Sequence, residues 1–375
     1  MKFTVNSKIL EKSLAKVIPG VPSKTMNPVM ENFFLQVSDG TLFITSTNEE
    51  VFLQCNLSVQ ATEDFVFLTN AKLFYDLVRS IPDTTLYVEA VDQSKLQLKT
   101  DNGVYNLNYD VSQEFPQIPV VNREFEFQIS GTLLKNIIEG TSFAIDKTNQ
   151  TRMAITGMLF DFRSDALVFV GTDGHKLVRR TQFEFKSETP HQIVVPERTT
   201  SILSKVCDGH QVTLFNDASY VHFQMPDLYI VSKLVTMKYP NYQTVIPQEN
   251  EKMLTVERKA LLNAVTRMLL FSNPRFQQLR LSIKENAIEL FSEDSNSHSS
   301  GLDTLESEYT GTPMDISFNP QFMQEILGHL TCEKVLFKLD TPTRAAILVP
   351  VVSEAEKEKE DILSLLMPVR LSTHS

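Results

Sequence analysis

The sequence predicts an α+β protein built from three similar domains, each with two helices packed on antiparallel sheets. Three observations support this fold class. The 375 residues are too many for one ordinary domain. A strand, a polar cap and an amphipathic helix recur with a period of about 125 residues, which fits three times into the chain. Short runs of alternating apolar and polar residues separate these segments and are typical of strands with one buried face, which need their helices on a single side.

The first helix of each repeat follows a short strand. The strands centre on Val5, Ile129 and Val256, which are spaced by 124 and 127 residues. Apolar residues recur at helical spacing after each strand, so one face of each helix is expected to pack on a sheet. The three helices are expected at residues 7–18, 131–145 and 258–272.

The second helix of each repeat lies roughly 65 residues further along the chain. Asn70 and Asn319 are expected to cap two of these helices, because an Asn side chain accepts hydrogen bonds from the first free backbone N–H groups. Pro196 and Pro320 fall near the first turn, where proline is tolerated. The three helices are expected at residues 71–81, 197–209 and 320–334.

Two proline-containing connectors mark the domain boundaries. The pairs Phe115-Pro116 and Tyr239-Pro240 are 124 residues apart, and an Ile-Pro pair follows each of them. Prolines stiffen such segments and keep the preceding residue extended. We place the boundaries near residues 122 and 249, which gives domains at 1–122, 123–249 and 250–375.

The composition excludes several classes of protein. Hydrophobic residues make up 42% and charged residues 22%, values that exclude disordered, collagen-like and low-complexity chains. No stretch approaches the roughly 18 apolar residues that a membrane span needs. The opening Met-Lys-Phe-Thr-Val-Asn turns polar too soon for a secretion signal. We therefore expect a cytoplasmic protein.

The three cysteines, Cys55, Cys207 and Cys332, form no close pair in the sequence, which argues against a disulfide framework or a zinc site. Cys207 and Cys332 end equivalent helices 125 residues apart. Matching positions in two repeats favour a packing role over metal or redox chemistry, so we expect reduced thiols in the core.

The charge is distributed unevenly between helices and strands. The chain has a net charge of −11, which argues against a phosphate-rich partner if the charge is spread evenly. The six predicted helices instead carry +5 in total, which leaves −16 for the remainder. For a single helix, lysines on a wet face are the ordinary explanation. Five of six helices are neutral or basic, and this bias favours a helical lining past which DNA runs.

The segment Thr172-Asp173-Gly174-His175 is the one that suggests a catalytic or metal site. A hydrolase needs a nucleophile, a base and a third orienting group, and a metal site needs more ligands at suitable spacing. The sequence has no HExxH, CxxC, GxSxG or Walker pattern. A glycine-rich turn at the end of a strand explains the segment better. We expect no enzymatic activity, no metal and no cofactor.

Several strings distributed over all three predicted domains carry a family resemblance. They are MKFTV at the start, Asn32-Phe-Phe-Leu-Gln-Val37, Gly157-Met-Leu-Phe160, Thr172-Asp-Gly-His-Lys-Leu177, Ser232-Lys-Leu-Val235, Tyr239-Pro-Asn-Tyr242, Phe271-Ser-Asn273 and Leu366-Met-Pro-Val-Arg-Leu371. In this combination the chain resembles the bacterial DNA polymerase III beta subunits, the sliding clamps. The resemblance implies the DNA clamp fold and a head-to-tail homodimer, in which three domains from each chain form a closed ring. Helices would line the hole, and backbone contacts with DNA would be independent of sequence and permit sliding.

The resemblance also implies a shallow apolar groove that binds short motifs from polymerase subunits, the clamp loader and repair proteins. An apolar floor with a few polar groups at its rim suits a site that holds anchor residues of a peptide. The tail after Leu365 is too apolar to be comfortably solvated, which fits such a groove. The groove should contain Ile155, Thr172, Gly174, His175, Lys176, Leu177, Pro240, Val245, Thr343, Ala345, Met367, Pro368, Val369, Arg370 and Leu371.

DNA contacts and the dimer interface are expected elsewhere. The helix charges and the resemblance point to DNA contacts by Lys24, Lys72, Asn149, Arg152 and Met153. The apolar helix end Met-Leu-Leu-Phe, followed by Ser-Asn-Pro, is expected to join domain 3 of one chain to domain 1 of its partner. Leu270 and Phe271 would pack on the edge strand that carries Tyr105 and Leu107.

We therefore expect a non-enzymatic processivity factor, which tethers a replicative DNA polymerase by encircling the duplex. The alternative is a DNA-free scaffold that collects peptide-bearing partners, and an enzyme is a distant third. The basic helices favour the first of these functions over the second.

Overall fold

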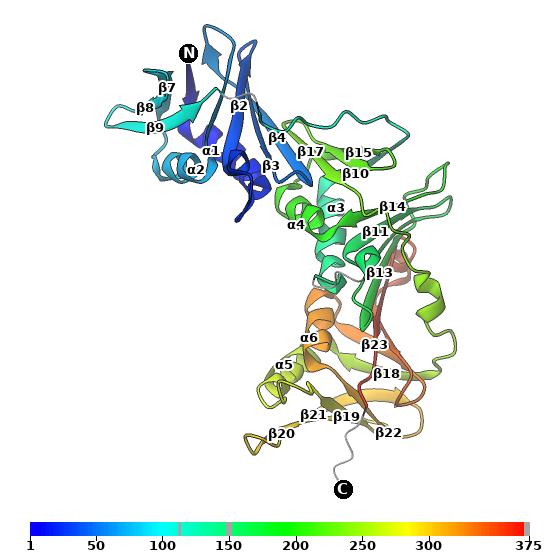
Figure 1. Ribbon diagram of the computed structural model, residues 1–375. Helices are drawn as coiled ribbons and strands as arrows, with labels where there is room; N and C mark the ends of the chain where they lie inside the picture. The colour runs from blue at the N-terminus through cyan, green and yellow to red at the C-terminus, as the bar shows by residue number, and fades with distance from the viewer. Residues whose placement is uncertain (112–113, 148–151, 371–375) are drawn as a thin grey trace. The chain divides into compact units, whose positions relative to one another are not determined.

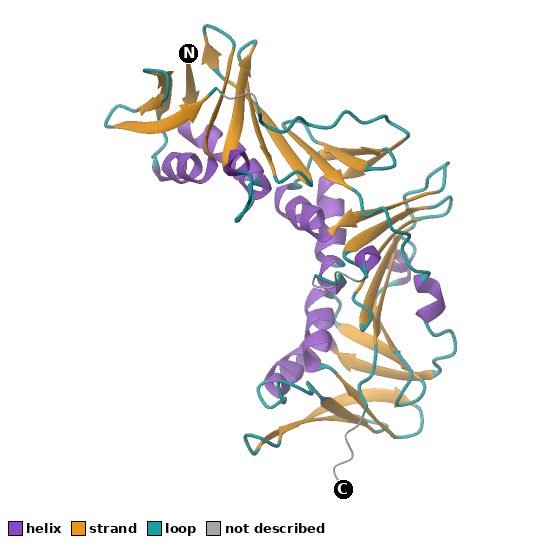
Figure 2. Ribbon diagram, viewed as in Figure 1, coloured by secondary structure: helices purple, strands orange, loops and turns teal. Residues whose placement is uncertain are grey.

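The computed structural model describes residues 1–111, 114–147 and 152–370. The chain divides into two compact units, Met1–Lys135 with Ile202–Leu234, and Asn136–Ser201 with Val235–Ser375. Each unit contains one antiparallel sheet (Figures 1 and 2). Within the described ranges, no helix is long and apolar enough to cross a membrane.

The sheet of the first unit has 13 strands. Its strands come from both the first and the second predicted domain, so the units do not follow the predicted boundaries. In spatial order they are β10 (Phe125–Ser130), β15 (Gln211–Asn216), β16 (Tyr220–Gln224), β17 (Leu228–Lys233), β4 (Val51–Ser58), β3 (Thr41–Thr47), β2 (Asn32–Ser38), β6 (Phe65–Asn70), β9 (Val104–Asp110), β8 (Lys95–Lys99), β7 (Thr85–Ala90), β1 (Lys2–Asn6) and β5 (Gln60–Ala61).

The sheet of the second unit has 12 strands. It likewise joins strands of the second predicted domain to those of the third, through the pairing of β13 with β25. In spatial order they are β14 (His191–Pro196), β11 (Gly157–Phe162), β12 (Leu167–Thr172), β13 (Lys176–Gln182), β25 (Glu360–Leu366), β24 (Ala346–Val351), β23 (Lys334–Leu339), β18 (Lys252–Glu257), β21 (Ser299–Thr310), β20 (Ala287–Asp294), β19 (Leu279–Ile283) and β22 (Met314–Phe318).

All six expected helices are present, and five of them begin directly where a strand ends; Asn319 separates β22 from the sixth. They are α1 (Ser7–Val17), α2 (Ala71–Ser80), α3 (Gly131–Glu139), α4 (Glu197–Val206), α5 (Arg258–Leu269) and α6 (Pro320–His329). A short helix α7 (Glu354–Lys357) and 3₁₀ turns at Ile18–Gly20, Pro28–Glu31, Ser142–Ala144, Met153–Ile155 and Tyr242–Val245 complete the described elements. The predicted repeat of strand and helix is therefore confirmed.

The helix starts show why strand and helix follow one another so closely. The side chains of Asn6, Asn70, Glu257 and Asn319 each accept hydrogen bonds from backbone N–H groups in the first turn of the helix that follows. An N-cap residue has extended backbone dihedrals, so the last residue of a strand can serve as the cap without an intervening loop.

The six helices all end before the predicted residue, and α3 does so by the widest margin. The helix predicted to reach residue 145 ends at Glu139, and a 3₁₀ turn follows after Gly140 and Thr141. Arg180 Nη1 donates to the carbonyl oxygen of Asn136 at 2.6 Å and lies 2.3 Å from where a Cβ at position 140 would stand. Glycine thus leaves room for a guanidinium that satisfies a carbonyl in the last turn of α3.

The helices pack on their sheets through buried apolar faces. In the first unit α1 contacts α2, β3 and β4 (Figure 1). Leu10, Leu14 and Phe74 are fully buried. In the second unit α5 and α6 contact one another, and Leu261 and Leu327 lie in the same buried cluster as the strands beneath them.

The cysteines agree with the predicted packing role. All three are free; Cys55 and Cys207 are buried and Cys332 is half-buried. Burial raises the pKa of the Cys55 and Cys207 thiols to about 12, which leaves them protonated and weakly nucleophilic at neutral pH.

The caps give a direct test of the strand-to-helix junction. The Asn70 side chain accepts from Leu73 N–H at 2.9 Å. Replacing Asn70 with Ala should lower the free energy of unfolding by about 1 kcal/mol, because that N–H loses its partner. Urea unfolding followed by circular dichroism measures the change. Asn70→Ser, which keeps a capping oxygen, is the control, and equal stability of the Ala and Ser variants would contradict the role of the cap.

Candidate partner-binding and nucleic-acid surfaces

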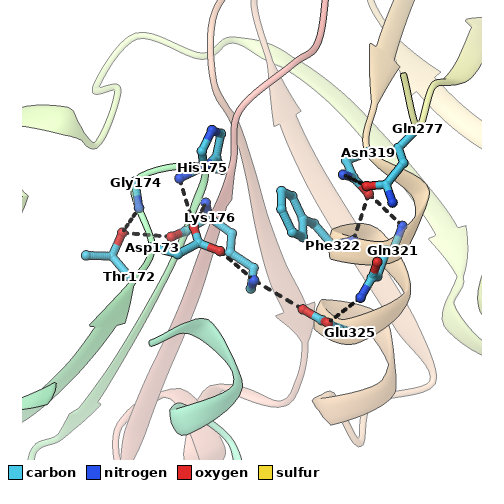
Figure 3. A network of polar contacts seen from close by, with 10 residues as sticks. All are labelled: Thr172, Asp173, Gly174, His175, Lys176, Gln277, Asn319, Gln321, Phe322 and Glu325. Atoms are coloured by element: carbon cyan, nitrogen blue, oxygen red, sulfur yellow. Dashed lines mark hydrogen bonds and ion pairs between the residues drawn. The ribbon is translucent and has the colours of Figure 1, made fainter. Parts of the chain in front are cut away.

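The turn from Thr172 to Lys176 joins β12 to β13 and is fixed by its own side chains. The Thr172 hydroxyl accepts from Gly174 N–H at 3.1 Å and donates to the Lys176 carbonyl at 2.7 Å (Figure 3). Asp173 Oδ1 accepts from the N–H groups of His175 and Lys176, both at 2.8 Å. Gly174 has φ +88°, a left-handed conformation that favours glycine. The turn is therefore rigid, and Thr172 and Asp173 serve its geometry.

The apolar tail after β25 lies against this turn. Met367 N–H donates to the His175 carbonyl at 2.9 Å, and Val369 N–H donates to the Ser317 carbonyl of β22 at 2.8 Å. Met367 is 42% exposed, while Leu365 and Leu366 are buried. The structure thus brings together two segments that the sequence analysis assigned to one groove.

A buried apolar layer lies beneath the turn and the tail. Ile155, Leu177 and Ala345 belong to one buried cluster, which also includes Leu365 of β25. These four side chains come from separate parts of the chain. Antiparallel pairing of β13, β25 and β24 brings three of those parts side by side.

The Tyr239–Tyr242 turn is held by its two tyrosines. The Tyr239 hydroxyl donates to the Val170 carbonyl at 3.3 Å, and Arg163 donates to the Tyr242 hydroxyl. Burial raises the pKa of both tyrosines, so both stay neutral. With its tyrosines turned inward, the turn leaves Pro240 exposed, and the neighbouring Val245 is 57% exposed.

The predicted groove residues therefore separate into a floor and an exposed set. The buried members are Ile155, Thr172, Lys176, Leu177 and Ala345; the exposed members are Gly174, His175, Pro240, Val245, Thr343, Met367 and Arg370; and Pro368 and Val369 are half-buried. Leu371 lies outside the described residues. An apolar floor beneath exposed apolar and polar groups can hold the side chains of an extended peptide.

The predicted DNA-contacting residues lie in different units. Lys24, in the loop after α1, and Lys72, in the first turn of α2, are exposed and belong to the first unit. Arg152 is exposed and Met153 is 53% exposed, and both belong to the second unit. Asn149 lies outside the described residues.

Part of the basic charge on the helices is neutralised within the chain. Lys8 and Lys16 of α1 form ion pairs with Glu11 at 2.8 Å and Asp227 at 2.6 Å. Arg258 of α5 donates to backbone carbonyls at the end of α6 and just beyond it. The helix total of +5 already subtracts Glu11, and backbone carbonyls leave the charge of Arg258 in place. Of these contacts, the pair with Asp227 is therefore the one that lowers the positive charge available to a partner, and sequence alone does not show it.

The predicted interface residues include two exposed apolar side chains and two that are more buried. Leu270, just after α5, is 80% exposed, and Phe271 packs against the backbone at Gly301. Tyr105 is 37% exposed, but Leu107 is 7% exposed and faces the core. On this face of β9 the accessible groups are therefore the backbone and Tyr105.

Strands β9 and β21 each have one edge that lacks a strand partner over part of its length, among the described residues. Over Val104–Asn108, β9 pairs only with β8, and it meets β6 only at Tyr109 and Asp110. Over Ser299–Glu306, β21 pairs only with β20 before it turns to β18. Leu302 on this part of β21 is 65% exposed. Strand β21 was not predicted, because its apolar residues Leu302, Leu305 and Tyr309 do not alternate with a period of two, and no sequence signal shows which edge stays open.

Comparison with known proteins identifies the class. Three family models match successive parts of the chain: the N-terminal domain of the DNA polymerase III beta subunit at residues 1–119, its central domain at 128–241 and its C-terminal domain at 243–370. The beta sliding clamps of Synechococcus elongatus and Escherichia coli K12 are 27% and 26% identical to this chain. Each comparison covers 99% of this chain and 100% of the relative.

Solved structures agree over the same length. A sliding clamp from Pseudomonas aeruginosa bound to griselimycin matches with a TM-score of 0.92 and 25% identity, over 99% of this chain and 100% of that one. A sliding clamp from Bacillus subtilis matches with a TM-score of 0.91 and 25% identity, over 99% of both chains.

The fold and these matches define a ring-forming, non-catalytic accessory factor of a DNA polymerase. The chain belongs to the DNA polymerase III beta subunit family, the sliding clamps. The predicted fold class, the sliding-clamp function and the absence of an enzymatic role are thereby confirmed. Membership of this family implies DNA, a DNA polymerase and a second clamp subunit as partners.

Proposed function

We propose that the chain forms a head-to-tail homodimeric ring of domains 1–122, 123–249 and 250–375, which encircles duplex DNA and tethers the replicative polymerase. The observation that carries the proposal is the match to sliding clamps along the whole chain. In both sheets, strands on either side of a proposed boundary pair directly, as β17 does with β4 and β13 with β25. Such pairing supports continuous sheets across successive domains. We also propose that the protein acts in the cytoplasm, together with these partners.

The proposed DNA contacts are Lys24, Lys72, Arg152 and Met153, together with Asn149 outside the described residues. Exposure of Lys24 and Lys72 supports their role, and no ion pair holds either ammonium within the described part of the chain. A ring is retained on DNA by its topology, so these contacts need only be weak and independent of sequence.

Charge reversal tests the DNA contacts. Lys24→Glu with Lys72→Glu should weaken binding to every duplex sequence alike and reduce the slope of log K against log salt by about 2, because two phosphate contacts are lost. Fluorescence anisotropy on labelled duplexes measures both effects. The control is Lys2→Glu with Lys95→Glu, which makes the same charge change on exposed strand residues. Unchanged affinity and slope in the first variant would defeat the assignment.

The proposed dimer contact brings the open edge of β9 in one chain to the open edge of β21 in its partner. Strand pairing would satisfy the open N–H and C=O groups on both edges. Leu270 and Leu302 would cover Tyr105 and the neighbouring Val104, which is 56% exposed. The contact therefore depends more on apolar burial than on ion pairs.

Removal of the apolar side chains tests this contact. The intact protein should have a mass of about 85 kDa by light scattering, twice the 42.6 kDa chain. Leu270→Ala with Phe271→Ala should give monomers at micromolar concentration, since the apolar burial is lost. Leu302→Asp, which alters only an exposed side chain, should do the same. Leu73→Ala, which truncates a leucine on α2 in the same way, is the control and should leave the dimer intact. If the first two variants remained dimeric, the interface would lie elsewhere.

The proposed partner site takes apolar peptide side chains, a leucine and an aromatic residue, between Leu177, Pro240, Val245 and Met367. Polymerase subunits, the clamp loader and repair proteins are the proposed sources of such peptides. Affinity should be roughly micromolar, because ordering of the peptide offsets much of the burial. Weak binding suits partners that exchange on one ring.

Truncation of the tail tests the partner site. A chain that lacks residues 367–375 should lose binding of a fluorescein-labelled peptide containing a Leu and a Phe, while remaining folded and dimeric. A chain that lacks only 372–375 is the control and should bind as the intact chain does. If the longer truncation bound the peptide with unchanged affinity, the groove would have been assigned to the wrong surface.

The match to sliding clamps along the whole chain argues against the alternative of a DNA-free scaffold that only collects peptide-bearing partners. The duplex-binding measurement checks this point, because such a scaffold would bind the peptide and show no salt-dependent affinity for DNA.

A further inference from the structure

Lys176 is a buried lysine whose ammonium group points away from solvent. Its side chain is 6% exposed. The ammonium lies 2.6 Å from Asp173 Oδ2 and 3.2 Å from Glu325 Oε2, and 4.2 Å from the centre of the Phe322 ring (Figure 3). Two carboxylates and an aromatic face therefore surround the charge, as a buried lysine requires.

These three partners come from two elements that are far apart in sequence. Asp173 belongs to the turn between β12 and β13, whereas Phe322 and Glu325 lie one helical turn apart on α6, so their side chains project from the same face of that helix. Lys176 thus connects the turn to α6 (Figure 3).

Helix α6 is a firm anchor for this connection. Met323, Ile326 and Leu327 on its inner face are buried. Glu325 is itself held, because Oε1 accepts from Gln321 Nε2 at 3.4 Å and Oε2 pairs with Lys176. Because Glu325 lies on a packed helix and its carboxylate is already oriented, it fixes the position of the Lys176 ammonium better than an exposed ion pair would.

The position of Lys176 in turn affects the tail. The residue before it, His175, supplies the carbonyl that accepts from Met367 N–H. Lys176 also donates its own N–H to Asp173, which closes the turn. A shift of the Lys176 side chain would therefore move the turn, and the turn holds the first residue of the tail.

We propose that Lys176 is a positioning residue for the partner site, and that its ion pair with Glu325 fixes the spacing between the Thr172–Lys176 turn and the tail. The proposal rests on the proposed peptide-binding function. Glu325, which lies outside the predicted groove, then influences affinity for apolar peptides without touching them. This role differs from that of a rim lysine that meets the peptide directly.

The peptide test uses five variants of the full-length protein, one of them a control. Glu325→Gln and Lys176→Met should each weaken binding of the fluorescein-labelled Leu- and Phe-containing peptide about fivefold or more. The double variant should weaken it no further than Lys176→Met alone, because that change already removes the pair with Glu325. Lys176→Arg should lose less affinity than Lys176→Met, since a guanidinium keeps a positive charge beside both carboxylates and Phe322. The matched control is Glu289→Gln on β20, which breaks the exposed pair with Lys284, just after β19, and should change nothing.

A second measurement does not depend on the peptide. Amide hydrogen exchange at Met367 should become several-fold faster in Glu325→Gln than in Glu289→Gln, because the carbonyl that protects it is less firmly placed. If the intact protein failed to bind the peptide, the proposed function would be wrong, yet this exchange would still report on the positioning role.

Two results would overturn the proposal. One is a Glu325→Gln variant with the peptide affinity and Met367 exchange of the intact protein. The other is a Lys176→Met variant that weakens binding while Glu325→Gln does not, since that pattern indicates direct contact between Lys176 and the peptide.

Discussion

The junction between each strand and the helix that follows it is the constraint on which the rest of the structure depends. A capping side chain at the junction lets the helix begin at once, as Asn6, the last residue of β1, and Asn319, the residue just after β22, show. With no loop between them, the direction of the strand fixes where the helix starts over the sheet. A strand leads into a helix six times with at most one residue between them, so the helices and the ladders of paired strands are specified together.

Antiparallel pairing then assembles sites from distant parts of the chain. Next to β13, β25 positions the tail against the turn that follows β12, and the buried cluster beneath them includes Ile155 and Ala345. The partner-binding surface thus results from the order in which the strands pair. Its polar groups serve mainly to fix the turn, which explains why a segment with Thr, Asp and His carries no catalytic arrangement.

Local patterns predicted much of this architecture. The period of about 125 residues, the caps at Asn70 and Asn319 and the glycine turn at Gly174 all depend on residues close in sequence, and the structure agrees with each. Features that depend on distant partners could not be predicted. The burial of Lys176 requires Glu325, the neutralisation of Lys16 requires Asp227, and the inward orientation of Leu107 depends on how β9 pairs with β8.

The half-open edges of β9 and β21 have a consequence for the unassembled chain. An open strand edge is a template for pairing with any extended segment, and Leu302 and Val104 add exposed apolar surface beside it. In the proposed assembly, each edge is covered by the other. Closing the ring would then also protect the protein from aggregation, and dilution, which favours monomers, would expose the segments most prone to it.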